Sequence, residues 1–427
     1  MTRRARPRWG RRLAWLLLIV LLWLLVLASM RFFAARGPVQ RVSATPAQIA
    51  HGRYLADAAD CAACHTAPGG APFAGGLPLA SPFGTIYATN ITPDPEHGIG
   101  RYTAEDFYRA LAEGEARDGH QLYPAMPYAS YRQIARADSD AIYAYLMQQP
   151  PVARPNSDND LAFPFNIRPG IHAWNLLFAN RQAPATSQGA SSAWQRGRYL
   201  SEALGHCGEC HSPRGWLGQV DVARPLAGND KLGRFASPDI TPQGLASRGW
   251  DSAQLRAYLR TGVADHAVAS DEMLRVVTLS TSRLNEADLA AMTTYLLGDH
   301  PPAPLAPPSP AATPAALEPG RRHYLNLCAG CHGGDGQGVP HVAPAMRGNS
   351  GLRDRDPHNL VVAILDGLPA HRFVGLQRMQ DMPGFSAELD DADIAVLASW
   401  LRQRYGGQAA VEEAAVARLR QDNDGQR

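Results

Sequence analysis

The sequence has no cysteine to spare: its 427 residues include only six, and each belongs to a Cys-x-x-Cys-His motif. The three motifs run from Cys61 to His65, from Cys207 to His211 and from Cys328 to His332. A structural zinc site built on such a pair usually has a second ligand pair nearby, and none recurs here at a fixed spacing. Neither local disulfides nor a thioredoxin-like dithiol requires a histidine at the same position three times.

The motif is the signature for covalent attachment of a c-type haem. On a helix its two cysteines and its histidine stand at i, i+3 and i+4, so the three side chains share one face. Each thiol can form a thioether to a haem vinyl group, and the histidine can take one axial position on the iron. We therefore predict three covalently bound c haems. The predicted attachment residues are Cys61, Cys64, Cys207, Cys210, Cys328 and Cys331, and the predicted axial histidines are His65, His211 and His332.

The body of the chain also lacks an excess of basic charge. Six arginines lie in the first twelve residues, and leaving them out turns the net charge of +2 into −4. A near-neutral, slightly acidic body without a basic surface argues against nucleic acid as a partner.

Charge is missing altogether from residues 13–30, an apolar run that follows these arginines. As a helix this run would span about 27 Å, close to a hydrocarbon core of about 30 Å. We predict that residues 1–36 form a retained membrane anchor; the alternative is a cleaved signal peptide with its cleavage site at residues 26–28. The basic flank stays in the cytoplasm, so both alternatives export the body. Haem attachment to this motif in bacteria occurs on the same side, which predicts a location at the periplasmic face of the inner membrane.

The body repeats one pattern three times. A short apolar segment precedes each haem motif (residues 52–55, 197–200 and 320–325), and a helix ending in an aromatic–Leu pair closes each unit. We predict that the aromatic residues of these pairs pack between the first and the last helix of their units. Linkers rich in small residues or proline separate the units. The aromatic residues are Tyr145, Tyr295 and Trp400, and the predicted domains are residues 44–153, 188–300 and 318–405.

Three further segments stand out. Asn90-Ile-Thr-Pro93 in the first unit is matched by Asp239-Ile-Thr-Pro242 in the second. Residues 161–178 are too apolar for a simple linker, so we expect them to pack against a haem domain, with docking to a partner as the alternative. The tail, residues 411–427, is charged and is predicted to fray.

The sixth ligand of each iron is predicted from the spacing of methionines. Met126, Met273 and Met382 lie 61, 62 and 50 residues after the haem histidines of their units. A lone methionine is usually core filler, as we predict for Met147 and Met292 in the closing helices. Three methionines at matched offsets are better explained as thioether ligands. The alternatives are Met346 and Met379 in the third unit, and a second histidine in each unit: His120, His266 and His371.

With the haem motifs, residues 90–100 and Leu122-Tyr-Pro-Ala-Met-Pro-Tyr128 in view, residues 44–405 resemble the tri-haem cytochrome c subunits of bacterial membrane-bound dehydrogenases. The resemblance implies a mostly α-helical chain of three class I-like cytochrome c domains with His/Met haems. It also implies a catalytic partner, which in that family is a quinoprotein, flavoprotein or molybdenum dehydrogenase. Electrons would pass from that partner to ubiquinone or a terminal oxidase.

The residues themselves point to electron transfer rather than to catalysis by this chain. No carboxylate pair, nucleophile triad or phosphate loop can be defended, and Gly333–Gly338 is better explained as a turn beside a haem. Irons with two protein ligands have no open position for substrate and transfer single electrons. The carbonyls of Pro68 and Pro213 are predicted to accept the imidazole N–H of the first two haem histidines. The alternatives are a multi-haem enzyme of the peroxidase or thiosulfate-oxidising type, with one open haem, and a haem-bearing structural subunit.

Overall fold

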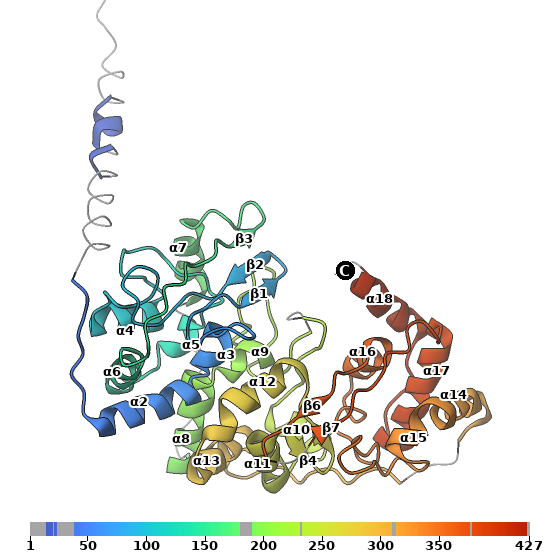
Figure 1. Cartoon of the computed structure of the whole chain (residues 1–427). Helices are drawn as coiled ribbons and strands as arrows, with labels where there is room; N and C mark the ends of the chain where they lie inside the picture. Colours follow the sequence, from blue (N-terminus) through green and yellow to red (C-terminus); the bar gives the residue numbers. More distant parts are fainter. Residues whose placement is uncertain are drawn as a thin grey trace, which may run out of the picture.

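The computed structural model describes residues 14–19, 21–23, 38–179, 190–230, 233–309, 313–375 and 378–424 (Figure 1). The fold is mostly helical, as predicted. The predicted anchor, residues 1–36, lies largely outside the described residues; its described parts, 14–19 and 21–23, are helical. In the described parts of the chain, no helix combines the length and apolarity needed to cross a membrane.

Three units follow one another along the chain, and we call them units 1, 2 and 3. Unit 1 comprises α2 (Pro46–Ala58), α3 (Cys61–His65), β1 (Pro78–Ser81), β2 (Gly84–Tyr87), α4 (Ala104–Glu113), α5 (Tyr128–Tyr131) and α6 (Arg136–Leu146). Unit 2 comprises α8 (Ser192–Arg198), the π-helical turn η2 (Tyr199–Leu204), α9 (Cys207–His211), α10 (Pro242–Ser247), α11 (Ser252–Thr261), β4 (Val263–Ala264), β5 (Ala267–Val268), α12 (Asp271–Leu279), the 3-10 turn η3 (Thr281–Arg283) and α13 (Glu286–Leu297). Unit 3 comprises the 3-10 turn η4 (Ala315–Leu317), α14 (Glu318–His323), the π-helical turn η5 (Tyr324–Cys328), α15 (Ala329–His332), α16 (His358–Asp366), β6 (His371–Arg372), β7 (Arg378–Met379), α17 (Asp391–Leu401) and the π-helical turn η6 (Arg402–Gly406).

The first and last helices of each unit cross at a glycine. A Cβ atom on Gly52 would lie 1.9 Å from the carbonyl oxygen of Ala141 and 3.0 Å from the Cβ of Tyr145, so only glycine allows this approach. The same arrangement recurs where Gly197 meets Ala291 and Tyr295, and where Gly320 meets Val396 and Trp400. The prediction that the aromatic residue of each closing pair packs between these helices is therefore confirmed.

Units 1 and 2 share one hydrophobic core and are joined reciprocally. The hydroxyl of Tyr54 in unit 1 donates to Asp288 Oδ2 of unit 2 at 2.5 Å. In the opposite direction, the hydroxyl of Tyr199 in unit 2 donates to Asp138 Oδ2 of unit 1 at 2.6 Å. Each tyrosine belongs to the apolar segment that precedes a haem motif, so the repeat serves the contact between units as well as the core of each unit.

Unit 3 has its own core and touches unit 2 through a small separate cluster. In that cluster Phe373 of unit 3 packs with Ala269 and Val277 of unit 2. The Arg234 guanidinium of unit 2 also pairs with the Asp366 carboxylate of unit 3 at 2.5 Å. Figure 1 shows unit 3 beside the joined pair of units 1 and 2.

The segment between units 1 and 2 packs against unit 1, as expected. Its strand β3 (Asp160–Leu161) extends an antiparallel sheet of order β1-β2-β3, with Gly84 opposite Leu161. The helix α7 (Gly170–Trp174) and the π-helical turn η1 (Asn175–Ala179) follow. Polar contacts hold this segment, because the hydroxyl of Tyr128 donates to Asn175 Oδ1 at 2.6 Å. Several of its apolar side chains remain exposed, among them Phe163 and Leu176.

The prediction that the tail frays is wrong for most of its length. Residues Glu413–Asp424 form α18, which packs against α16 and α17. Val416 is completely buried, and the Arg420 guanidinium donates to the Asp391 carboxylate at 2.7 Å. The charged composition concealed an apolar stripe that includes Val416 and Leu419 and covers the core of unit 3.

Candidate haem sites

Each haem motif lies on a short helix between the first helix of its unit and a long loop. In units 1 and 2, the residue before the first cysteine adopts a left-handed conformation, Asp60 at φ 53° and His206 at φ 37°, and the motif helices α3 and α9 begin directly after it. In unit 3 the π-helical turn η5 runs directly into α15. The motif is therefore helical in all three units, which places its cysteines and histidine on one face.

A backbone carbonyl fixes each haem histidine. The Nδ1 atom of His65 lies 2.6 Å from the carbonyl oxygen of Thr89, and a carbonyl can only accept, so Nδ1 carries the proton. The remaining ring nitrogen, Nε2, is then the one that can bind iron. The other two histidines are held in the same way, His211 Nδ1 by Pro238 O at 2.8 Å and His332 Nδ1 by Pro344 O at 2.9 Å.

The predicted acceptors Pro68 and Pro213 are wrong. Thr89 O and Pro238 O take this role in units 1 and 2. The carbonyl of Pro213 instead accepts from the backbone N–H of Asp221 at 2.8 Å. Nearness in sequence was a poor guide, because a returning loop brings the true acceptor to the imidazole from 24 or 27 residues further along the chain.

The Asn/Asp-Ile-Thr-Pro motif begins directly after these acceptor carbonyls. In unit 1, Asn90 Oδ1 accepts from the backbone N–H of Thr92 at 2.9 Å and from its hydroxyl at 2.7 Å. In unit 2, Asp239 Oδ1 accepts from the same two groups of Thr241, at 2.8 and 2.6 Å. Such side-chain-to-backbone bonds fix a tight turn. The motif thus holds in place the carbonyl that orients the haem histidine.

A glycine completes each histidine cradle. The N–H of Gly75 donates to the carbonyl of His65 at 2.8 Å, and a Cβ atom on this glycine would lie 2.4 Å from the carbonyl carbon of Thr89. Its φ of 70° is also a conformation that favours glycine. The matching bonds are Gly228 N–H to His211 O at 2.7 Å and Gly338 N–H to His332 O at 2.8 Å. Gly338 ends the segment predicted to be a turn, and the structure confirms that prediction.

Burial favours the neutral form of the three haem histidines. Desolvation lowers the pKa of His65, His211 and His332 below the usual value, although a hydrogen bond to the backbone opposes the shift in each case. A neutral imidazole with its Nδ1 proton directed at a carbonyl is the form that binds a metal. Two thiols and one such imidazole on a common helix face are the donor set that a c-type haem requires, so the residues present fit the group.

The candidate methionines pack against different hydrophobic clusters of the three units. Met126 and Met273 pack against the core of units 1 and 2, which Cys61 and Cys207 also contact. In unit 3, Met382 packs against the core that Cys328 contacts, and so does its rival Met346. The other rival, Met379, packs instead in the cluster between units 2 and 3.

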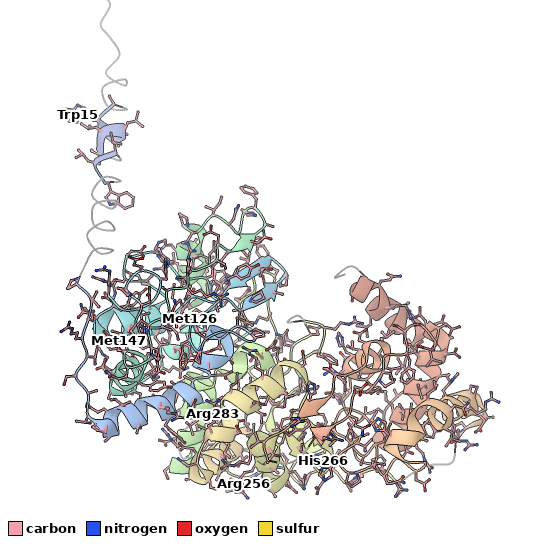
Figure 2. All side chains as sticks on the ribbon, in the orientation of Figure 1. Trp15, Met126, Met147, Arg256, His266 and Arg283 are labelled. Atoms are coloured by element: carbon pink, nitrogen blue, oxygen red, sulfur yellow. The ribbon has the colours of Figure 1, made fainter. Side chains whose placement is uncertain are left out.

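Met147 and Met292 pack in the core as predicted, Met292 being almost fully buried. Figure 2 shows Met126 and Met147 in unit 1 and His266 in unit 2.

The rival histidines have different surroundings. His120 Nδ1 lies 2.5 Å from a carboxylate oxygen of Asp118, on a partly exposed loop. His266 packs against Trp250, with ring centroids 4.6 Å apart. The Nε2 atoms of His266 and His371 are buried and have no hydrogen-bond partner within the described residues. Across these residues, no group of three or more His, Cys, Asp or Glu side chains could hold a metal ion by itself.

Sequence reasoning missed the carbonyl acceptors and two charged residues near the first motif. Asp60 is 7% exposed, and one of its carboxylate oxygens has no hydrogen-bond partner in the described structure. Arg275 reaches α3 from the other unit. The repeated Asn/Asp-Ile-Thr-Pro motif was a signal that could have located the acceptors. No sequence signal indicated the contact of Arg275.

A motif helix of this kind, next to a crossed helix pair and with its histidine fixed by a carbonyl, defines a cytochrome c domain. The family model described as cytochrome c matches residues 49–150 and 317–404. Membership of this family implies covalently bound haem c.

Relatives whose matches cover most of both chains identify the family more closely. The cytochrome c subunit of a quinone-type alcohol dehydrogenase from Gluconobacter oxydans is 35% identical over 419 residues, which cover 93% of this chain and 87% of the relative. The gluconate 2-dehydrogenase cytochrome c subunit of Pantoea cypripedii is 36% identical over 93% of this chain and 94% of the relative. The chain belongs to the family of cytochrome c subunits of dehydrogenases.

Another relative is much longer than this chain. A nicotinate dehydrogenase subunit of Pseudomonas putida is 41% identical over 366 residues, which cover 84% of this chain. The match spans only 30% of that relative's own length.

Proposed function

We propose that the chain is the tri-haem electron-transfer subunit of a membrane-bound dehydrogenase. In this proposal it accepts electrons from a catalytic subunit at the periplasmic face of the inner membrane and passes them to ubiquinone or a terminal oxidase. The support comes from relatives named as cytochrome c subunits of alcohol, gluconate 2- and fructose dehydrogenases. Residues 1–36 would anchor the chain in this membrane.

One observation carries the proposal: the same histidine cradle occurs three times. Each cradle combines a motif helix, a carbonyl acceptor for Nδ1 and a glycine N–H bonded to the histidine carbonyl. Three cradles support three covalently bound haems, one in each of the proposed domains 44–153, 188–300 and 318–405. A di-haem c-type cytochrome of Cereibacter sphaeroides matches 58% of this chain, a share that two of the three units would fill.

Different residues of the chain would attach the haem and bind its iron. The cysteine pairs would fix the edge of each macrocycle, and His65, His211 and His332 would supply one axial nitrogen. Bound haem c supplies reversible one-electron oxidation and reduction. The carbonyl behind each histidine fixes the orientation and the tautomer of the imidazole, so that Nε2 would be directed at the iron.

We propose Met126, Met273 and Met382 as the sixth ligands. Their packing against the same cores as the haem cysteines supports this choice. Met379 is less suitable because it packs only in the cluster between units 2 and 3, whereas Met273 contacts both that cluster and the core that Cys207 contacts. With both axial positions filled by protein, an iron has no place for substrate, so the chain would relay electrons while chemistry takes place on the partner.

Purification of the full-length tagged chain from detergent-solubilised membranes tests the proposal. A second subunit with dehydrogenase activity should co-purify, and adding its substrate should reduce the haems. Alcohols, gluconate, fructose and nicotinate are the first substrates to test, since relatives are named for them. A chain that purifies alone, stays oxidised with these substrates and reacts with peroxide or thiosulfate at an open haem would overturn the proposal.

A further inference from the structure

Arg275 reaches from unit 2 into the haem motif of unit 1. Its Nε atom donates to the carbonyl of Ala63 at 2.8 Å, and its Nη2 atom donates to the same carbonyl and to that of Thr66 at 2.9 Å. Ala63 and Thr66 flank Cys64 and His65. Carbonyls at the end of a helix lack partners within the helix, and a cation is favourable there. Arg275 of unit 2 therefore supplies hydrogen-bond donors to carbonyls at the end of α3 in unit 1.

The helix that supplies this arginine also carries a proposed haem ligand. Arg275 lies on α12, two residues after Met273, and α12 packs against α3. Figure 1 shows α3, α9 and α12 together where units 1 and 2 meet. One helix thus carries Met273, the proposed sixth ligand of haem 2, and also holds the attachment helix of haem 1 through Arg275.

Two acidic side chains lie near this contact, and Arg275 is one of the cations close to them. Asp60, at the start of α3, is buried with one carboxylate oxygen unpaired, and Glu272 of α12 is a second acid close enough to raise the pKa of the Asp60 carboxyl. Arg275 and Arg283 are the cations that act on Asp60, with Arg275 acting more strongly. The reverse contact, from unit 1 to the haem motif of unit 2, is a neutral hydroxyl: Ser130 Oγ donates to Glu209 Oε1 at 3.1 Å.

We propose that Arg275 is a positioning residue for haem 1, supplied by unit 2, that raises the potential of haem 1 and couples it to haem 2. The inference rests on the proposed function, in that both units must carry haem. A fixed positive charge beside an attachment helix favours the reduced iron, which carries one positive charge fewer. A change at the Met273 ligand would reach His65 through the same helix and its three hydrogen bonds.

Potentiometric titration of the full-length holoprotein tests this inference with the variants Arg275→Gln, Arg275→Lys and Arg283→Gln. Arg283→Gln is the matched control, because it removes an arginine that also joins the two units, through Asp57 at 2.7 Å, but that acts on Asp60 less strongly than Arg275 does. The redox step of haem 1 is the one missing from a Cys61→Ser/Cys64→Ser variant. Arg275→Gln should lower the potential of haem 1, Arg275→Lys should restore part of it, and Arg283→Gln should lower it by clearly less than Arg275→Gln, because Arg283 acts more weakly at the start of α3.

Two results would overturn the inference: equal haem 1 potentials in Arg275→Gln and wild type, or equal shifts in Arg275→Gln and Arg283→Gln. Loss of haem 1 from Arg275→Gln, with haem 1 retained in Arg283→Gln, would support it. Haem content separates this test from the proposed function. A wild-type chain with fewer than three haems would contradict the proposed function, whereas three haems with unchanged potentials would contradict only the role of Arg275.

Discussion

His211 Nδ1 and the carbonyl oxygen of Pro238 lie 2.8 Å apart, and Asp239 follows this carbonyl directly. Because the Asp239 carboxylate accepts two hydrogen bonds from Thr241, the turn that presents the carbonyl depends on a side chain that does not touch the histidine. The equivalent bonds of Asn90 show that the same device serves unit 1. Orientation of the haem ligand is thus encoded outside the haem motif.

Replacing Asp239 with Ala removes both turn bonds and leaves the polar groups of Thr241 without their acceptor. We expect a loss of about 1–3 kcal/mol in the free energy of unfolding, measured by denaturant titration of the holoprotein. Asp239→Asn keeps the accepting Oδ1 and should stay within about 0.5 kcal/mol of wild type. Equal losses in the two variants would show that the turn bonds are not the cause.

The sequence predicted the parts of the fold that depend on local repetition. The motif helices, the crossed helix pairs and the packing of Tyr145, Tyr295 and Trp400 follow from patterns that recur at each unit, and all are present. The turn at Gly333–Gly338 was equally visible, because glycine readily adopts the positive φ that tight turns require, as Gly333, Gly336 and Gly338 do here.

What depends on distant parts of the chain could not be predicted. The acceptors for the haem histidines arrive from the far end of a loop, so the nearer Pro68 and Pro213 were the wrong choice. The fraying of the tail was wrong because a few apolar residues such as Val416 outweigh many exposed charges. The contact of Arg275 with Ala63 joins two units, and no feature of the repeated sequence pattern indicates it.

The proposed sixth ligands are tested by Met126→Leu, Met273→Leu and Met382→Leu. Leucine keeps volume and apolarity, so folding should survive at a cost below about 1.5 kcal/mol. Each variant should lose the spectroscopic signature of sulfur ligation at one haem and shift the potential of that haem.

Electron flow to quinone should slow in each variant, while partner activity with an artificial acceptor that bypasses the haems should not change. Replacements of His120, His266 and His371 are the comparison set. If these variants shift the potentials while the leucine variants keep wild-type values, the second ligands are histidines.

The buried carboxyl of Asp60 should make the stability of the folded protein depend on pH. Desolvation raises the pKa of its carboxyl to about 8, although the positive charge of Arg275 opposes the shift. A raised carboxyl pKa stabilises the folded state at low pH, and this contribution is lost as the pH rises from about 4 through about 8. Asn tolerates the left-handed backbone of this position. Asp60→Asn should therefore remove this pH dependence, and should be more stable than wild type at pH 8 by an amount on the order of a few kcal/mol.

Denaturant unfolding of both holoproteins at a series of pH values from 5 to 9 measures this effect. A wild-type stability that rises over this range relative to Asp60→Asn would mean that the carboxyl is ionised and stabilised in the folded protein.

The N-terminal region is tested by sequencing the mature chain. We expect it to retain Trp15 to Met30 and to need detergent for extraction, because an apolar run of this length flanked by arginines can stay in the bilayer. A mature chain that begins near Ser29 and is released without detergent would indicate a cleaved signal peptide instead.

The number of haems tests the account most directly. A pyridine haemochrome assay on the full-length chain, combined with protein quantitation, measures covalently bound haem per polypeptide. The three matching histidine cradles predict three haems. A value near two or one in a fully matured preparation would contradict the interpretation of this chain as three cytochrome c units in series.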